Sequence, residues 1–121
     1  MKQALIVDES GAVGDFAAAA LPQTAYELTV VSSLQEALAL VTIAPYHLIM
    51  IARLHVCPGA LWNMVESIQR LSSDATLVLV QAEEADSEFY AMAQELGAVV
   101  LGTPLDITAQ AVFQSAILSQ P

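Results

Sequence analysis

The sequence is poor in cysteine and in basic residues, and each shortage excludes a class of protein. Its 121 residues include one cysteine, Cys57, which cannot form an intramolecular disulfide or supply a thiolate metal site alone. Three lysines and arginines stand against 13 acids, which gives a net charge of −10. Nucleic-acid phosphates and anionic membrane surfaces both require clustered cations. We therefore expect this domain to bind neither nucleic acid nor membrane.

Long hydrophobic runs are also missing, although 56% of the residues are hydrophobic. No stretch approaches the ~18 uninterrupted apolar residues of a membrane helix, because Pro45 and His47 interrupt the richest region, 38–52. The N-terminus reaches Asp8 before an apolar segment long enough for a secretory signal can form. These features predict a cytoplasmic protein.

The length predicts one domain that spans residues 1–121. The sequence leaves open whether this domain stands alone or forms the N-terminal part of a longer protein.

Short apolar runs alternate with segments of helical periodicity, which is typical of βαβ units and a parallel sheet. The run at 48–51 is apolar on both faces and is expected at the sheet centre. Expected strands are 4–7, 28–31, 48–51, 76–80 and 99–101. Expected helices are about 12–21, 34–43, one after a loop around Pro58-Gly59, 87–96 and 107–118.

Two of these helices carry more detailed predictions. Ser33 and Glu36 form a capping box, in which the Ser33 side chain accepts from the Glu36 N–H and the Glu36 side chain reaches back. The last helix is expected to begin after Asp106 and to pack through one inner stripe. That stripe is predicted to comprise Ile107, Val112 or Ala111, Ala116 and Leu118.

The carboxyl ends of the strands are where an open parallel sheet binds its ligands. Only the first strand ends in acids, Asp8 and Glu9, whereas the later ends offer Ala52, Gln81 and Thr103. None of these three is a strong nucleophile, base or metal ligand in that setting. We therefore expect a binding role, with no catalytic residue and no cofactor.

The ordered motifs resemble the receiver domain of bacterial response regulators, the CheY-like domains. ALIVDES resembles the first strand of that family with its acidic pair, and YELTVVSSLQEAL its second strand and following helix. HLIMIA and LVLVQA match the third and fourth strands, and ELGAVVLGTPLD the fifth strand with its flanking turns. The resemblance covers some 115 residues. It implies a three-layer flavodoxin-like α/β fold, with a five-stranded parallel sheet in the order 2-1-3-4-5 and helices on both faces.

The same resemblance implies that the phosphorylation site is degenerate. Working receivers phosphorylate an aspartate after the third strand, and the corresponding residue here is Ala52, which has no oxygen to accept a phosphoryl group. The switch threonine or serine corresponds to Gln81, and the phosphate-binding lysine to Thr103. The sequence thus predicts a pseudo-receiver that transmits a signal without phosphorylation.

Asp8 and Glu9 have two interpretations. They are hard oxygen ligands for Mg²⁺ or Ca²⁺, yet two carboxylates plus water are expected to bind weakly because the family's third carboxylate is missing. The alternative is a solvated pair, one member of which caps the first helix. We expect no physiological metal.

The resemblance implies that partners bind through the fourth helix, fifth strand and fifth helix, either as a different protein or as a second copy. Trp62, Tyr90 and Leu101 are the candidate contact residues, and Trp62 is expected to be partly exposed. It is equally consistent that Trp62 and Tyr90 only cover neighbouring loops. A second hypothesis is a small-molecule sensor that uses the crevice at the strand ends.

Overall fold

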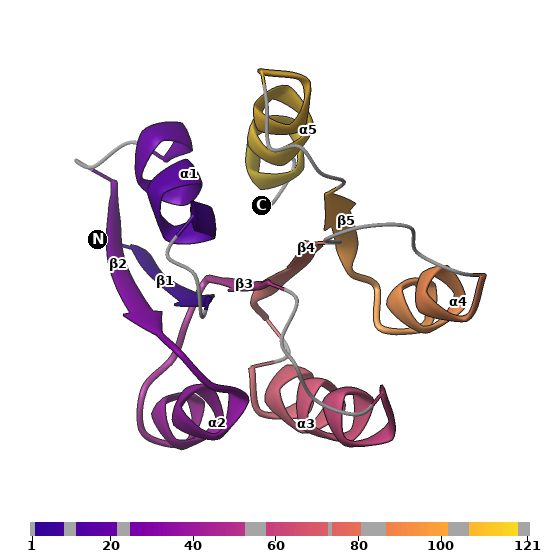
Figure 1. Ribbon diagram of the computed structural model, residues 1–121. Coiled ribbons are helices and arrows are strands. Elements are labelled where there is room, and N and C mark those ends of the chain that lie inside the picture. The colour runs from indigo at the N-terminus through magenta and orange to yellow at the C-terminus, as the bar shows by residue number, and fades with distance from the viewer. Residues whose placement is uncertain are drawn as a thin grey trace.

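The computed structural model describes residues 2–8, 12–21, 25–52, 58–72, 74–80, 87–101 and 107–118. At 12–13, 58–61, 87–90, 107, 109 and 116–118 the description covers the backbone alone. Strands and helices alternate along the whole chain (Figure 1). The strands are β1 (Lys2–Val7), β2 (Tyr26–Val31), β3 (Leu48–Ile51), β4 (Thr76–Val80) and β5 (Val99–Leu101). The helices are α1 (Ala12–Ala20), α2 (Leu34–Ile43), α3 (Pro58–Leu71), α4 (Ser87–Glu95) and α5 (Ile107–Leu118).

The five strands form one parallel sheet in the order β2-β1-β3-β4-β5. This is the predicted flavodoxin-like order. The chain adds β2 on one side of β1 and then adds β3, β4 and β5 in turn on the other side. Every residue of β3 is buried, as are the last four of β1 and of β4. The runs that are apolar on both faces therefore occupy the centre, because helices cover both sides of a parallel sheet.

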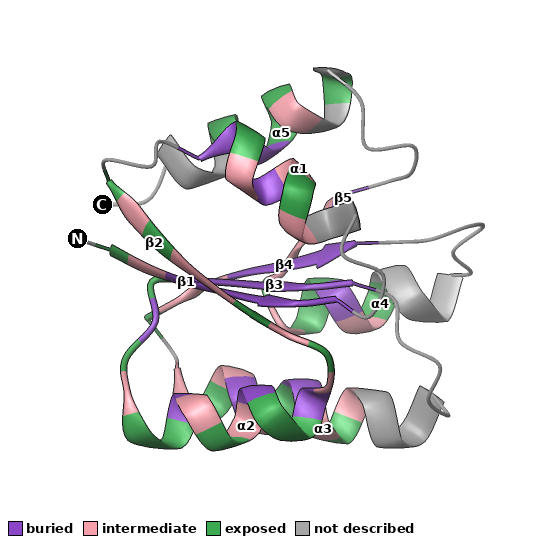
Figure 2. Ribbon diagram, turned by 60° about the vertical axis from the view of Figure 1, so that its left-hand side comes forward, coloured by how far each residue is buried: buried purple, intermediate pink, exposed green. Residues whose placement is uncertain are grey.

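The helices form two layers around the sheet (Figures 1 and 2). α1 and α5 cover one face, and α2, α3 and α4 cover the other. Strand side chains alternate between the two layers, so that Leu5, Val7 and Ile49 join one buried cluster while Ala4, Ile6 and Met50 join the other. We call these the α2/α3 cluster and the α1/α5 cluster.

Helix α2 begins at the predicted capping residue. The Ser33 Oγ accepts from the Glu36 N–H at 3.2 Å, as the capping-box pattern predicts. The return contact differs from the prediction by one residue, because the Glu36 Oε2 accepts from the N–H of Ser32 at 3.3 Å. The first contact satisfies an amide in the first turn of the helix that has no carbonyl partner within it, and the second binds the amide of the residue just before the N-cap.

Three element boundaries differ from the predicted ones. Pro58 and Gly59 lie within α3 rather than in a loop, because a proline at the first helical position has no N–H to lose and a fixed φ that suits the helix. Strands β1 and β2 begin two residues earlier than expected, with Lys2 pairing opposite Tyr26. Gly97 follows α4 and stops it, as predicted. Its φ is +68°, a conformation that glycine adopts without strain.

The middle of the inner face of α5 was predicted wrongly, and the side chains of the other predicted positions, Ile107, Ala116 and Leu118, lie outside the described ones. Val112 and Ala111 are exposed, and Phe113 is the fully buried residue that anchors the helix. The Phe113 ring contacts the Phe16 ring of α1 with 5.7 Å between centroids, which holds the two helices of this layer together. Almost every residue of α5 is apolar or small, so hydrophobic spacing alone defines no preferred face.

Candidate functional site

Asp8 and Ala52 lie side by side at the carboxyl edge of the sheet. Val7 and Ile51 are paired in the β1–β3 register, so the next residue of each strand, Asp8 and Ala52, leaves the sheet at the same level. The Ala52 N–H donates to the Val7 carbonyl at 2.9 Å, and the Asp8 N–H donates to the Val31 carbonyl at 2.9 Å. The backbone therefore fixes both positions firmly.

The Asp8 side chain is bound to the start of α1. It is 6% exposed, and its Oδ2 accepts from the Gly14 N–H at 3.2 Å. Gly14 is the third residue of the helix, where the amides lack carbonyl partners and the helix dipole favours a negative charge. Asp8 thus makes the helix-capping contact of the second interpretation, but its side chain is buried rather than solvated as that interpretation expected.

Ala52 is part of the apolar core. It is 6% exposed and belongs to the α1/α5 cluster together with Met50 and Val80. A methyl group here contributes packing, and it brings no oxygen, nitrogen or sulfur atom to the neighbourhood of Asp8. The side chain offers nothing to phosphorylate and nothing to bind a cation.

The other residues of the predicted site cannot be placed. Glu9, Gln81 and Thr103 lie outside the described residues. Arg53 and Cys57, which follow Ala52 closely in the sequence, lie outside them too. The structure thus brings together two of the five predicted positions, Asp8 and Ala52.

Among the described residues, this edge offers a single carboxylate as a ligand for Mg²⁺ or Ca²⁺. These cations take six or more oxygen ligands and are held in proteins by several carboxylates or carbonyls. Of the two described side chains, only Asp8 is a carboxylate, and one of its oxygens is already bound to Gly14. Within the described part of the chain, no three acidic, histidine or cysteine side chains gather as a metal site would require.

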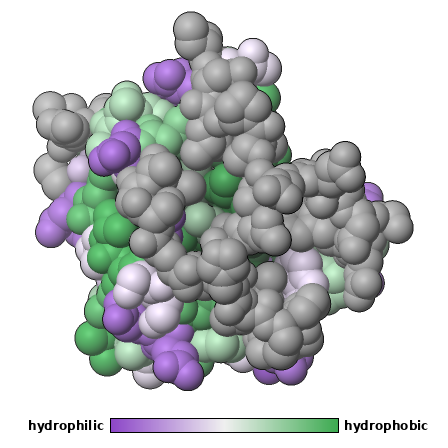
Figure 3. All heavy atoms as spheres, viewed as in Figure 1, coloured by the Kyte–Doolittle hydropathy of each residue, from purple (hydrophilic) through white to green (hydrophobic). Residues whose placement is uncertain are grey.

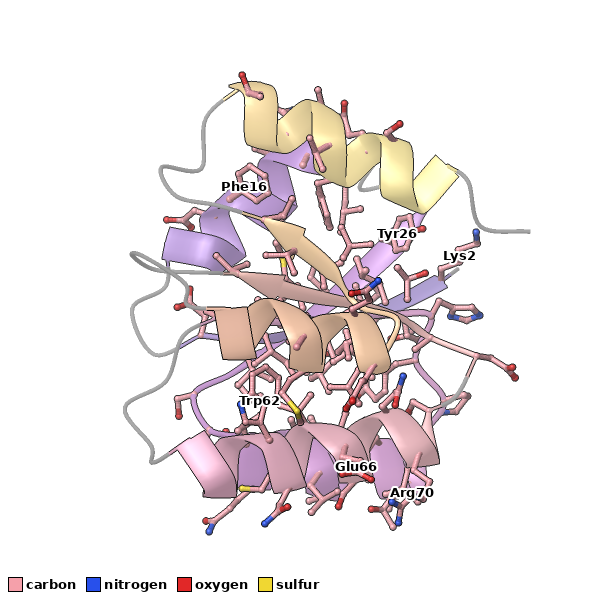
Figure 4. All side chains as sticks on the ribbon, turned by 90° about the vertical axis from the view of Figure 1, so that its right-hand side faces the viewer. Lys2, Phe16, Tyr26, Trp62, Glu66 and Arg70 are labelled. Atoms are coloured by element: carbon pink, nitrogen blue, oxygen red, sulfur yellow. The ribbon has the colours of Figure 1, made fainter. Side chains whose placement is uncertain are left out.

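The three candidate contact residues, Trp62, Tyr90 and Leu101, differ in how far the structure agrees with their predicted exposure. Trp62 is half-buried and packs against the α2/α3 cluster (Figure 4), which agrees with its predicted partial exposure. The Tyr90 side chain lies outside the described part of α4. Leu101 is 1% exposed in the α1/α5 cluster and is therefore wrong as a surface contact. It is buried because α5 packs directly over β5 and covers it.

Sequence reasoning missed the exposed apolar residues. Val112 on α5 is 46% exposed, and Val30 on the edge strand β2 is 52% exposed. Hydrophobic residues cover the side of the molecule on which β2 lies (Figure 3). A valine within an apolar run predicts burial, so no sequence signal marked either of them.

Many solved structures have a similar fold, at low sequence identity to the chain. A response regulator from Thermotoga maritima superposes with a TM-score of 0.80 at 17% identity and covers 98% of this chain and 99% of its own. A CheY-like receiver domain protein from Methanospirillum hungatei gives 0.78 at 19% identity, with 99% and 96% covered. The chain has the receiver fold. A structure described as adenylate cyclase from Rhodopirellula baltica gives 0.76 at 19% identity, with 98% and 88% covered.

Sequence comparisons add no closer relative of this receiver-fold chain. No protein-family model matches it, and no curated protein sequence matches it either. Among the helices of the described residues, none combines the length and apolarity that crossing a membrane would demand.

Proposed function

We propose that this chain is a pseudo-receiver, a signal-transduction module that acts without phosphorylation and without catalysis. The observation that carries the proposal is the buried methyl group of Ala52 beside Asp8. Response regulators and CheY-like proteins are among the structures of similar fold, which supports a role in signalling. The absence of an acceptor oxygen at position 52 supports independence from phosphate.

The capping contact of Asp8 supports the same proposal. In a phosphorylatable site the carboxylates must remain available for a cation. Here the Asp8 Oδ2 binds the Gly14 amide, so its negative charge stabilises the start of α1. This arrangement favours a domain that keeps one conformation.

Signalling without phosphate leaves the surface as the working part of the molecule. We propose contact with a protein partner or a second copy through α4, β5 and α5. Among the described residues of this surface, the exposed large hydrophobic one is Val112, and its neighbour Ala111 is exposed too. This replaces Leu101, whose burial removes it from the surface. Tyr90 remains a proposed contact on α4, and Trp62 a proposed contact on α3.

Two valines of similar exposure provide a matched test of this surface. Val112→Glu adds a charge to α5, whereas Val30→Glu adds the same charge to β2 at the opposite edge of the sheet. We expect Val112→Glu to abolish the interaction, measured as self-association in sedimentation equilibrium or as recovery of a partner in affinity purification. We expect Val30→Glu to preserve the same interaction. Loss with Val30→Glu alone would contradict the proposed surface.

Amide NMR with a phosphate analogue tests the independence from phosphate. We expect beryllofluoride with Mg²⁺ to leave the amide NMR spectrum unchanged, because Ala52 has no carboxylate to bind it. Shifts of the amides of Asp8 and Ala52 would contradict the proposal. The small-molecule sensor predicts a ligand-dependent thermal shift, and no observation among the described residues favours it.

A further inference from the structure

The amino-terminal end of the sheet carries a pocket that the proposed signalling role does not use. Its volume is about 370 Å³, within the range of ligand pockets. It lies where α2 and α3, which pack side by side, both end (Figure 2). Ala52 and Asp8 lie at the opposite, carboxyl end of the same strands. The residues that matter for its chemistry are Ile43, Pro45, Tyr46, Leu71, Ser72 and Asp74.

The sequence builds the apolar rim of this pocket. Ala44 precedes Pro45, and the proline ring disfavours helical geometry for the residue before it. Ala44 accordingly has φ −149° and ψ 147°, which stops α2 and leaves Ile43 79% exposed. Leu71 at the end of α3 is 53% exposed. Two large aliphatic side chains thus flank one opening.

The electrostatics of the pocket favour a cation. Two helices present their carboxyl ends here, and each carries a partial negative charge from carbonyls without helical partners. The Asp74 side chain adds a full negative charge, and none of the described residues that line the pocket is basic. The Ser72 hydroxyl in the pocket wall is enclosed and has no hydrogen-bond partner among the described residues, which is uncommon for a buried polar atom.

The basic residues of the described chain are engaged elsewhere. The Arg70 guanidinium lies 2.9 Å from the Glu66 carboxylate on α3, and the Lys2 ammonium lies 5.8 Å from the centre of the Tyr26 ring (Figure 4). Neither residue lines the pocket. A cation for this site must therefore come from outside the described part of the chain.

We propose that this pocket binds an arginine or lysine side chain of a partner protein, with an aliphatic residue next to it. The cationic group meets Asp74 and the two helix ends, and its aliphatic stem lies along Tyr46 and Pro45. The exposed Ile43 and Leu71 argue for a protein segment, because a small free cation would leave them uncovered. This site goes beyond the proposed function, since it does not depend on position 52.

A peptide titration followed by amide NMR tests the inference. The probes are the capped tripeptide Leu-Arg-Leu, the same tripeptide with glutamine in place of arginine, and free agmatine. We expect Leu-Arg-Leu to shift the amides of Thr42, Ile43, Ser72 and Asp74, and to bind more tightly than the other two probes. Equal binding of the glutamine peptide would overturn the claim that the pocket selects a cationic side chain. Equal binding of agmatine would overturn the claim that it binds a protein segment.

Matched variants distinguish this pocket from general attraction to an acidic protein. Asp74→Asn should weaken Leu-Arg-Leu binding about 2- to 5-fold, as expected for one exposed ion pair. Asp15→Asn removes an exposed acid of α1 on the other layer and should change nothing. Ile43→Ser should also weaken binding. Unchanged affinity in Asp74→Asn, or an equal loss in Asp15→Asn, would overturn the proposal, whatever the outcome at position 52.

Discussion

At the scale of single residues, the edge of the sheet is defined by a pair of side chains with different chemistry. Asp8 binds the third amide of α1, and Ala52 packs into the α1/α5 cluster. Both roles are structural. The sequence predicted that one acidic residue caps the first helix, because this follows from local rules for helix starts. The missing acceptor at position 52 was implied by the resemblance to receivers and stays a prediction.

Removal of the Asp8 carboxylate should destabilise the fold. Asp8→Ala leaves the Gly14 amide without this acceptor, and we expect the free energy of unfolding in urea to fall by about 1–2 kcal/mol. Asp8→Asn keeps an acceptor oxygen and should lose less. Asp15→Asn, in the first turn of the helix that Asp8 caps, removes an exposed charge but no hydrogen bond and should cost less, about 0.3–1 kcal/mol. A more stable Asp8→Ala variant would mean that carboxylate repulsion governs this edge, against our account.

Leu101 marks a limit of prediction at this scale. The resemblance to receivers made Leu101 a candidate contact on the fifth strand, yet α5 packs over β5 and buries Leu101 with Phe113. Burial of this kind depends on where a later helix packs. The residues around position 101 carry no information about that contact.

At the scale of elements, strong periodicity and short end signals predicted helices and strands well. α2 begins at its capping box, and β3 and β4 have the predicted bounds because turn or polar residues flank short apolar runs. Prediction failed where a signal was ambiguous. Pro58-Gly59 resembles a turn but opens α3. Most residues of α5 are apolar or small, and the middle of its inner face was therefore assigned wrongly.

The observed orientation of α5 can be checked with two neighbouring substitutions. Phe113→Ala removes a fully buried ring that contacts Phe16, and we expect a loss of about 3–5 kcal/mol in the free energy of unfolding. Val112→Ala trims a half-exposed side chain and should cost about 0.5 kcal/mol or less. Urea denaturation of both variants measures this difference. A larger loss for Val112→Ala would restore the orientation that the sequence first suggested.

At the scale of the whole molecule, the net charge of −10 is the dominant property. Charge far from zero keeps a protein soluble but destabilises its compact state through self-repulsion. The sequence revealed this property directly, since it needs only a count of residues. The placement of the acidic pocket at the ends of α2 and α3 was not predictable, because it depends on how those two helices meet.

Screening of this repulsion should stabilise the fold. Raising NaCl from about 0.01 M to about 0.15 M shortens the Debye length from about 30 Å to about 8 Å, and we expect the Tm to rise. A variant that neutralises three exposed acids, Asp15→Asn, Asp74→Asn and Glu95→Gln, should respond less. A Tm that falls with salt in the unaltered protein would show that attractive charge pairs dominate instead.

The central claim is that this receiver fold signals without accepting phosphate, and intact-mass spectrometry after treatment with acetyl phosphate and Mg²⁺ tests it most directly. The response regulator from Thermotoga maritima can be treated in parallel for comparison. Our account predicts that the mass of the chain stays unchanged. An added mass of one phosphoryl group, on Asp8 or any other residue, would contradict it.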